Sequence, residues 1–356
     1  MAIQTLAIKY RPHTWDDLTE QESIKIILKQ QLETDEIKNA YLFCGPAGCG
    51  KTTSARIFAN EINKGQGNPI EMDAASNSGV DDVRNIIQQA KTKSLDSEYK
   101  VFIIDECHSI SNTGWQAFLK LIEEPPAKSI FIFCTTDPQK IPKTILSRVQ
   151  RYDFTKISQS GIVKRLLHIL HIEFNDRRFE DERLTQDIKD AVEYIAKISE
   201  GGMRDAISLL DKSLSYSKEL TLKNVINALG TTDYDIMFEL TTNIINWNID
   251  KAIEIIENIN NSGKDIKHFV KQFTHFLIDL QKYDIMRNES WKYISIPKID
   301  AYEKFMKGFL DDDNFSTLLD LLNVFVKLNA DIKYSNVPKY DIEAQIILFR
   351  NVDRGI

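Results

Sequence analysis

One segment of the chain runs Tyr41-Leu42-Phe43-Cys44-Gly45-Pro46-Ala47-Gly48-Cys49-Gly50-Lys51-Thr52-Thr53. It fits the pattern G-x-x-x-x-G-K-[ST], placed between an apolar run that predicts a strand and a helical pattern over 52–62. Glycines let the backbone N–H groups of such a loop surround a phosphate, and the helix N-terminus adds partial positive charge. We expect Lys51 to reach the β- and γ-phosphates of a nucleotide and Thr52 to place its hydroxyl on Mg²⁺. The alternative is a glycine-rich turn that binds nothing.

Apolar runs rich in β-branched and aromatic residues recur through the first 155 residues. They are continuous rather than alternating, which is typical of strands buried on both faces of a parallel sheet. Helical patterns lie between them, so strand and helix alternate and predict an α/β domain. The four runs cover 41–44, 70–72, 101–104 and 129–134, and the helical patterns cover 52–62, 79–93 and 114–123.

The third run ends in two carboxylates, Asp105 and Glu106. Ligands of an open α/β sheet bind at the carboxyl ends of the strands, which is where these side chains are expected. Phosphoryl transfer needs one group for the metal and one for the nucleophile. Asp105 is therefore expected to hold Mg²⁺ and Glu106 to polarise the attacking water. The alternative is an ordinary charged turn.

Helical spacing replaces the strand-like runs after about residue 158. Three helices are expected up to Tyr216, with Glu200-Gly201-Gly202 just before the third. From Thr221 onward the pattern is helical throughout. Its expected breaks are Gly230, Ser262-Gly263, Pro297 and Pro338.

Composition excludes several classes of protein. Hydrophobic residues make up 42% and charged residues 27% of the 356 residues, which argues against a disordered or fibrous chain. No uninterrupted apolar run of about 18 residues exists, so a membrane span is excluded, and the N-terminus lacks the features of a secretory signal. The net charge of −7 does not favour a generic nucleic-acid binder, but a local basic strip is compatible with it.

The cysteines form no Cys-x-x-Cys pair. Buried free thiols in a reducing cytoplasm are the expected state, with disulfides or a zinc site as the alternatives. The four are Cys44, Cys49, Cys107 and Cys134.

Further motifs surround the phosphate loop. With them, the chain resembles the clamp-loader ATPases, and within these the gamma/tau subunit family of bacterial DNA polymerase III, over about residues 7 to 232. The shared text is KYRP at 9–12, AYLFCGPAGCGKTT at 40–53, EMDAASNSGVDDVR at 71–84, VFIIDECHSIS at 101–111, FLKLIEEPP at 118–126, TTDPQKIPKTILSR at 135–148 and GGMRDAISLLD at 201–211.

The resemblance implies an AAA+ P-loop ATPase domain over 1–157, a small helical lid over 158–220 and a helical collar for oligomerisation over 221–356. It implies a Mg²⁺-dependent ATP hydrolase that opens a sliding clamp and loads it onto primed DNA. The implied partners are other clamp-loader subunits in a ring, the sliding clamp, a primed double-stranded/single-stranded DNA junction and a replicative polymerase.

The resemblance also implies roles for single residues. Tyr10, Arg11 and Pro12 match the segment that lines the adenine side of the site. Thr136, with Thr135 beside it, matches sensor 1, a hydroxyl that would feel the γ-phosphate.

Two arginines match further family positions. Arg204 matches sensor 2, which reaches from the lid to the phosphates of its own subunit. Arg148 matches the arginine finger, which acts on ATP bound by the neighbouring subunit and offers a planar fork to phosphate oxygens. The alternatives are a surface role for Arg148 and a pairing of Arg204 with Asp205 or Asp211.

The chain departs from the family pattern in several places. Val149 replaces a cysteine after the arginine finger, and Glu20-Gln21 replaces Gly-Gln. Only Asn63 to Pro69 fill the position of a four-cysteine zinc module, so no zinc is expected. The long tail of the tau form is missing as well. The shortened module and the missing tail together suggest a divergent or phage-encoded version.

DNA contact is expected at two helix starts, because short polar side chains and backbone N–H groups hold phosphates without reading bases. The first is Ser76, Asn77, Ser78 and Gly79 with Arg84, and the second is Ser109 to Thr113. The alternative is plain N-capping of these helices. Three lysines would add charge or simply lie on a solvated face: Lys91, Lys93 and Lys143.

Two other functions remain open. One is a different AAA+ ring motor, such as a branch-migration helicase, although no winged-helix pattern follows the lid. The other is a non-hydrolysing structural loader subunit, which would have a broken phosphate loop, whereas Lys51 and Thr52 are intact.

Overall fold

The computed structural model describes residues 4–77, 79–94, 96–175, 179, 185–229, 234–286, 299–309 and 312–352. Ser78 and the predicted breaks Gly230 and Pro297 lie outside these residues. The chain divides into two compact units, Met1–Leu184 with Ile195–Asp211 and Thr185–Tyr194 with Lys212–Ile356. No helix in the described part of the chain is long and apolar enough to span a membrane.

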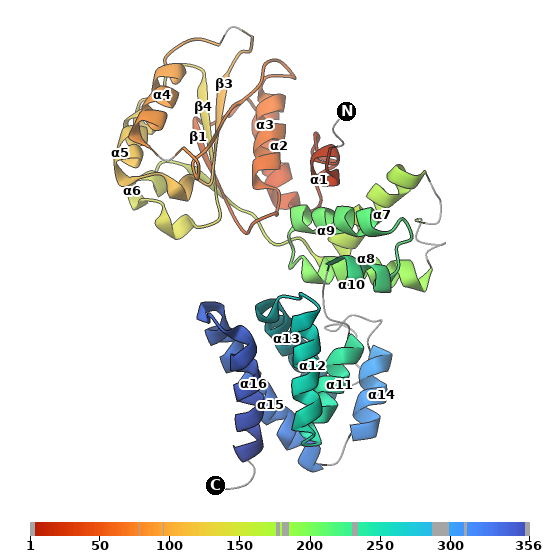
Figure 1. Ribbon diagram of the computed structural model, residues 1–356. Coiled ribbons are helices and arrows are strands. Elements are labelled where there is room, and N and C mark those ends of the chain that lie inside the picture. The colour runs from red at the N-terminus through yellow and green to blue at the C-terminus, as the bar shows by residue number, and fades with distance from the viewer. Residues whose placement is uncertain are drawn as a thin grey trace. The chain divides into compact units, whose positions relative to one another are not determined.

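A parallel five-stranded sheet organises the first unit (Figure 1). Its strand order is β2-β3-β4-β1-β5. This confirms the predicted α/β class. Strand β1 lies between β4 and β5, with Cys44 opposite Thr135 and Asp153. The carboxyl ends of β1 and β4 are therefore neighbours. The strands are β1 Ala40–Cys44, β2 Ile70–Asp73, β3 Lys100–Asp105, β4 Ser129–Thr135 and β5 Gln150–Asp153.

The sheet is buried on both faces, which explains the continuous apolar runs. Along β1, Leu42 belongs to one hydrophobic cluster while Tyr41 and Phe43 belong to another. Helices α4 (Val80–Ala90), α5 (Asn112–Glu123) and α6 (Lys143–Leu146) supply the first cluster. The second is filled by α2 (Glu22–Glu33) and α3 (Lys51–Ile62), so the two sets cover opposite faces, as Figure 1 shows.

The prediction of four strands was one too few. Strand β5 carries the sequence Gln-Arg-Tyr-Asp, of which only Tyr152 is buried. It pairs with β1 alone and is therefore an edge strand. Edge strands are often polar. This strand has no apolar run, so its sequence does not predict a strand.

Short helical segments connect these elements. They are α1 Leu6–Lys9, the 3₁₀ turn η1 Cys107–Ser109 and the 3₁₀ turn η2 Pro138–Lys140. The three helices expected after residue 158 are present. They are α7 Gln159–Phe174, α8 Gln186–Ile198 and α9 Met203–Tyr216.

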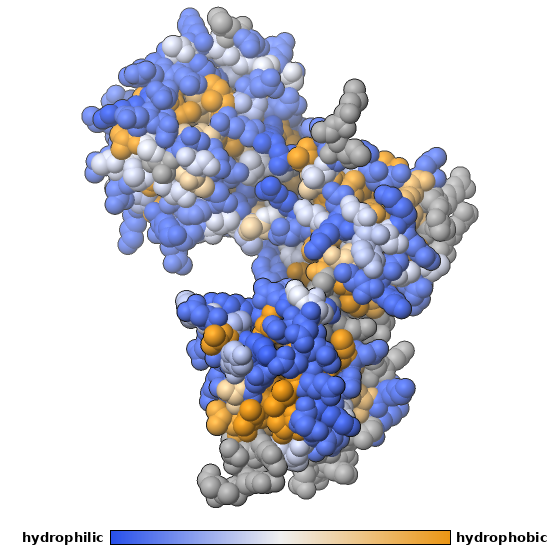
Figure 2. Space-filling view, viewed as in Figure 1, coloured by the Kyte–Doolittle hydropathy of each residue, from blue (hydrophilic) through white to orange (hydrophobic). Residues whose placement is uncertain are grey.

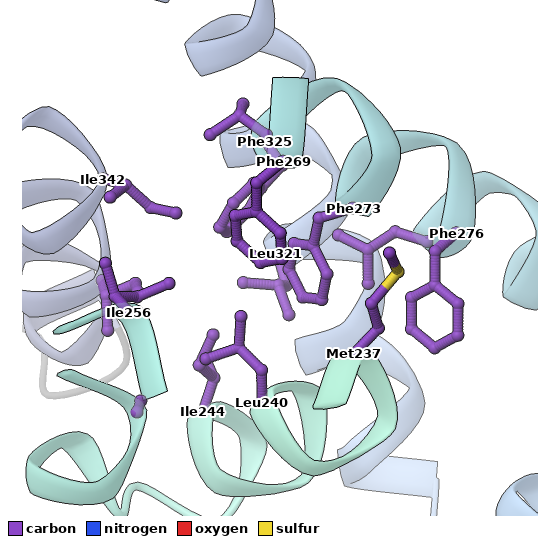
Figure 3. Packing of buried hydrophobic residues seen from close by; sticks show 14 of the residues in the cluster. Met237, Leu240, Ile244, Ile256, Phe269, Phe273, Phe276, Leu321, Phe325 and Ile342 are labelled. Atoms are coloured by element: carbon purple, nitrogen blue, oxygen red, sulfur yellow. The ribbon is translucent and has the colours of Figure 1, made fainter. Parts of the chain in front are cut away.

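The second unit is helical wherever it is described, as predicted. Aromatic and aliphatic side chains from several helices fill its core, including Phe273 and Phe325, whose ring centroids lie 4.7 Å apart (Figure 3). Pro338 begins a helix, whereas Ser262 caps the end of one. The remaining helices are α10 Leu222–Leu229, α11 Tyr234–Ile245, α12 Ile249–Asn261, α13 Ile266–Met286, α14 Ile299–Phe309, α15 Asp312–Asp331, the 3₁₀ turn η7 Ile332–Tyr334 and α16 Pro338–Val352.

Candidate nucleotide-binding site

The glycine-rich loop joins β1 to α3 and curls around the side chain of Lys51. The ammonium of this buried lysine donates to the carbonyl oxygens of Gly45 and Pro46 at 2.8 and 2.7 Å. Gly48 has φ +70°, and a Cβ there would lie 2.9 Å from Cα of Gly202. The loop therefore requires glycine at position 48, both for its backbone conformation and for the close approach of a second segment.

The two carboxylates lie at the end of β3, as predicted. The Thr52 hydroxyl donates to Oδ2 of Asp105 at 2.8 Å. This contact brings together a hydroxyl and a carboxylate, the oxygen ligands that Mg²⁺ prefers in proteins. The donor set of Thr52 and Asp105 fits the ion that the sequence implies.

Glu106 has a left-handed backbone conformation, with φ 46° and ψ 41°. Such a conformation is uncommon for a non-glycine residue and is often found at functional sites. Its carboxylate accepts a hydrogen bond from the Thr136 hydroxyl at 3.1 Å. Nδ1 of His108 lies 3.3 Å from the same oxygen and 3.2 Å from Oγ1 of Thr135. The ends of β3 and β4 thus hold the Glu106 carboxylate between two partners.

A cavity of about 280 Å³ lies over the glycine-rich loop within the first unit. This volume is near the lower end of the range for small-molecule sites, roughly 300–1,000 Å³. Residues from the N-terminal segment, the loop, the end of β3 and helices α7 and α9 line it. The predicted site residues among them are Tyr10, Arg11, Pro12, Ala47, Gly48, Cys49, Gly50, Lys51, Thr52, Thr53, Asp105, Glu106 and Arg204.

The start of α9 contacts the glycine-rich loop directly. The backbone N–H of Met203 donates to the carbonyl of Gly48 at 3.0 Å. Arg204, the next residue, lines the cavity. Among the described residues it forms no ion pair, either with Asp205 or with Asp211. The Asp211 carboxylate instead accepts a hydrogen bond from the backbone N–H of Leu6 at 3.0 Å.

Arg148 does not line this cavity. It follows α6, with its side chain about two-fifths exposed, and its Nε lies 2.9 Å from Oε1 of Glu123. Its guanidinium also donates to the carbonyl of Thr144 at 2.8 Å and to Oγ of Ser147 at 3.0 Å.

All four cysteines are free thiols and buried. Burial raises the pKa of Cys44 to about 11 and those of Cys107 and Cys134 well above the ordinary value. Within the described residues, no three His, Cys, Asp or Glu side chains gather at metal-binding spacing. The expected absence of zinc stays a prediction.

The two helix starts at which DNA contact is expected differ in charge. At α4, Asp82 accepts from the backbone N–H of Gly79, and Arg84 pairs with Asp81 at 3.0 Å. At α5, the Ser111 hydroxyl accepts from the backbone N–H of Gly114, and the first turn has no acidic residue. Capping thus occurs at both, and carboxylates occupy only the first.

Two residues near the site were not predicted from the sequence. His108 lies two positions after Glu106, and its proximity in the chain was the signal that was missed. Arg165 comes from α7 and lines the cavity, yet it lies far along the chain from the other site residues. No local motif indicates its position.

The sheet order, the glycine-rich loop, the acidic end of β3 and the α9 arginine define an AAA+ P-loop protein. The structure is similar to a Thermotoga maritima RuvB Holliday junction branch migration motor, with a TM-score of 0.50 and 21% sequence identity. The match covers 66% of this chain and 79% of the other. At this identity the likeness shows the fold alone.

Sequence relatives identify the family. Residues 64–158 match the family model described as DNA polymerase III, delta subunit. The chain is 32% identical to DNA polymerase III subunit tau of Bacillus subtilis over 98% of its own length and 63% of that protein. It is 33% identical to subunit tau/gamma of Haemophilus influenzae over 98% of its length and 51% of that protein. These matches support the clamp-loader family, which includes the gamma/tau subunits, and the chain spans between about half and two thirds of the length of these relatives.

Proposed function

We propose that this chain is an ATP-hydrolysing subunit of a clamp loader, which uses ATP to open a sliding clamp and load it onto primed DNA. The observation that carries the proposal is the single cavity shared by the glycine-rich loop, Asp105, Glu106 and Arg204. Membership of the clamp-loader family supports the assignment of the substrate as ATP and of the target as the clamp.

Each end of the nucleotide has a place in this proposal. Tyr10, Arg11 and Pro12 lie against the adenine side. The backbone N–H groups of the loop and the Lys51 ammonium hold the phosphates, and Lys51 exchanges its two loop carbonyls for phosphate oxygens. Thr52 and Asp105 would hold Mg²⁺, which supplies neutralising charge to the phosphates when it is bound.

Glu106 is proposed to orient and polarise the attacking water. A carboxylate held by Thr136 and His108 is fixed in place but has part of its acceptor capacity in use. We propose that Thr136 senses the γ-phosphate by shifting its hydroxyl from Glu106 to a phosphate oxygen. Arg204 adds a positive charge from the same subunit.

Arg148 is proposed to complete the site of a neighbouring subunit. Its absence from the cavity of its own chain supports this, because the guanidinium is not engaged at the nucleotide site of that chain. Its pairing with Glu123 keeps it oriented until a phosphate competes for it.

Residues 221–356, which make up most of the second unit, are proposed as the collar that joins subunits in the ring. Figure 2 shows apolar side chains gathered over part of this unit. Exposed apolar residues of this kind often mark protein contacts. We propose that the chain consists of an ATPase domain over 1–157, a lid over 158–220 and a collar over 221–356. The exposed apolar side chains of α15, η7, α16 and the connection before α16 are Leu319, Val326, Tyr334, Val337, Tyr340, Ile347 and Leu348.

ATP turnover of the chain, assembled with its partner subunits, tests the proposal. We expect slow basal turnover that rises when sliding clamp and primed DNA are added together, and no turnover in assemblies that carry Lys51→Ala. Stimulation by four-way DNA junctions instead would indicate a branch-migration motor. Absence of nucleotide binding would indicate a structural subunit.

A further inference from the structure

Arg165 places a guanidinium in the cavity from helix α7, on the side of the N-terminal segment. Its Nη2 donates to the backbone carbonyl of Tyr10 at 3.0 Å. This bond connects α7 to the start of the segment Tyr10–Pro12, all within the first unit. Both ends of the bond line the same cavity as the glycine-rich loop.

The charge of Arg165 is only partly compensated. Burial lowers its pKa, and Asp17 and Tyr10 oppose that effect. Asp17 acts on the guanidinium through its charge and not through a hydrogen bond. A guanidinium has five N–H donors, and Tyr10 accepts one of them. A partly buried arginine beside a cavity can donate hydrogen bonds to a polar ligand. It can also hold in place the protein segment that contacts the ligand.

We infer that Arg165 is a positioning residue for the nucleoside part of the bound nucleotide: it fixes the Tyr10–Pro12 wall against α7 through the Tyr10 carbonyl. The inference rests on the proposed function, since it assumes that a nucleoside triphosphate fills the cavity. It assigns the phosphates to Lys51 and the loop, and the shape of the opposite wall to Arg165. The two ends of the ligand should therefore respond separately to mutation.

Competitive binding against a fluorescent ATP analogue tests this separation. The competitors are ATP and inorganic tripolyphosphate, which has the phosphates but no nucleoside. Arg165→Met should weaken ATP binding by about tenfold, because the Tyr10–Pro12 wall loses the charged hydrogen bond that fixes it and must then be ordered when ATP binds. Its affinity for tripolyphosphate should stay within about twofold of wild type, which also shows that the loop remains folded.

Two further variants sharpen the test. Arg165→Lys keeps the charge and should bind ATP with an affinity between those of the wild type and of Arg165→Met. Lys164→Met removes an exposed charge from the same helix and should change neither affinity. At saturating ATP, Arg165→Met should turn over at a rate close to wild type, because a positioning role at the nucleoside end changes KM rather than kcat.

The possible outcomes distinguish a failure of this inference from a failure of the proposed function. The inference is wrong, and the ATP site stands, if Arg165→Met binds ATP as tightly as wild type does. The same holds if the variant loses affinity for ATP and for tripolyphosphate to the same extent. If wild type binds neither competitor, the proposed function fails, and the inference fails with it.

Discussion

Thr136 differs from most of the predicted site residues because its hydroxyl holds a carboxylate and does not line the cavity. It reaches Glu106 from the end of the neighbouring strand β4. The sequence places Thr136 after an apolar run and the resemblance suggests its role. The partner is visible only in the structure, because strand order brings β3 and β4 together.

Thr136→Val should slow ATP turnover of the assembled loader by about 10- to 100-fold, since Glu106 loses the group that positions it. ATP binding by the isolated chain should change by less than about threefold. Turnover and binding are measured on the same preparations. Thr34→Val, which removes an exposed threonine hydroxyl outside the cavity, serves as the control. Equal turnover in the two variants would show that Thr136 has no part in the chemistry.

Cys44 makes stability depend on pH. Burial raises its pKa from 9.0 to about 11, so the unfolded thiol ionises first as the pH rises. The free energy of unfolding should therefore fall above pH 9, by about 1.4 kcal/mol per pH unit from this group alone, until about pH 11. Urea unfolding at several pH values measures it.

Cys44→Ala provides the comparison. It should be less stable at pH 8 because of the lost packing, but its stability should fall less steeply between pH 9 and 10. Identical slopes in the two proteins would mean that Cys44 ionises as readily in the folded state as in the unfolded one.

At the scale of elements, the predictable parts are those whose signal is local. The glycine-rich loop, the β3 strand and its two carboxylates are each contained in a few consecutive residues, so sequence was sufficient to find them. Strand β5 and Arg165 depend on contacts between distant segments. Tyr152 of β5 is buried only because β1 lies beside it, and Arg165 meets the site only because α7 packs near Tyr10.

Strand β5 contributes to the core mainly through Tyr152. Its ring lies 5.6 Å from that of Phe43 and 6.2 Å from that of Tyr41, and its hydroxyl accepts from Gln31 at 3.2 Å. Tyr152→Ala should lower the free energy of unfolding by about 3–5 kcal/mol, as for other large-to-small core changes. Urea denaturation measures the change.

Arg151→Ala is the matched control on the same strand. Its partly exposed side chain pairs with Asp153, and an ion pair of this kind is worth less than about 1 kcal/mol. A loss in Arg151→Ala as large as that in Tyr152→Ala would show that β5 does not anchor the sheet through its buried tyrosine.

Hydrolysis by the whole assembly is proposed to need a site that a second subunit completes with Arg148. Arg148→Ala should leave ATP binding near that of wild type and cut turnover of the assembled loader by about 10³-fold or more, the effect of losing such a finger elsewhere. Lys140→Ala, which removes a nearby exposed charge paired with Asp137, should turn over normally. Normal turnover in Arg148→Ala assemblies would exclude a role in a neighbour's site.

We propose that the cavity over the glycine-rich loop holds Mg²⁺·ATP, and calorimetric titration of the purified chain measures this binding. We expect wild type to bind one nucleotide per chain, more tightly with Mg²⁺ than without it, and Lys51→Ala to show no measurable binding. Equal ATP binding by wild type and Lys51→Ala would contradict it, because the nucleotide would then be bound elsewhere.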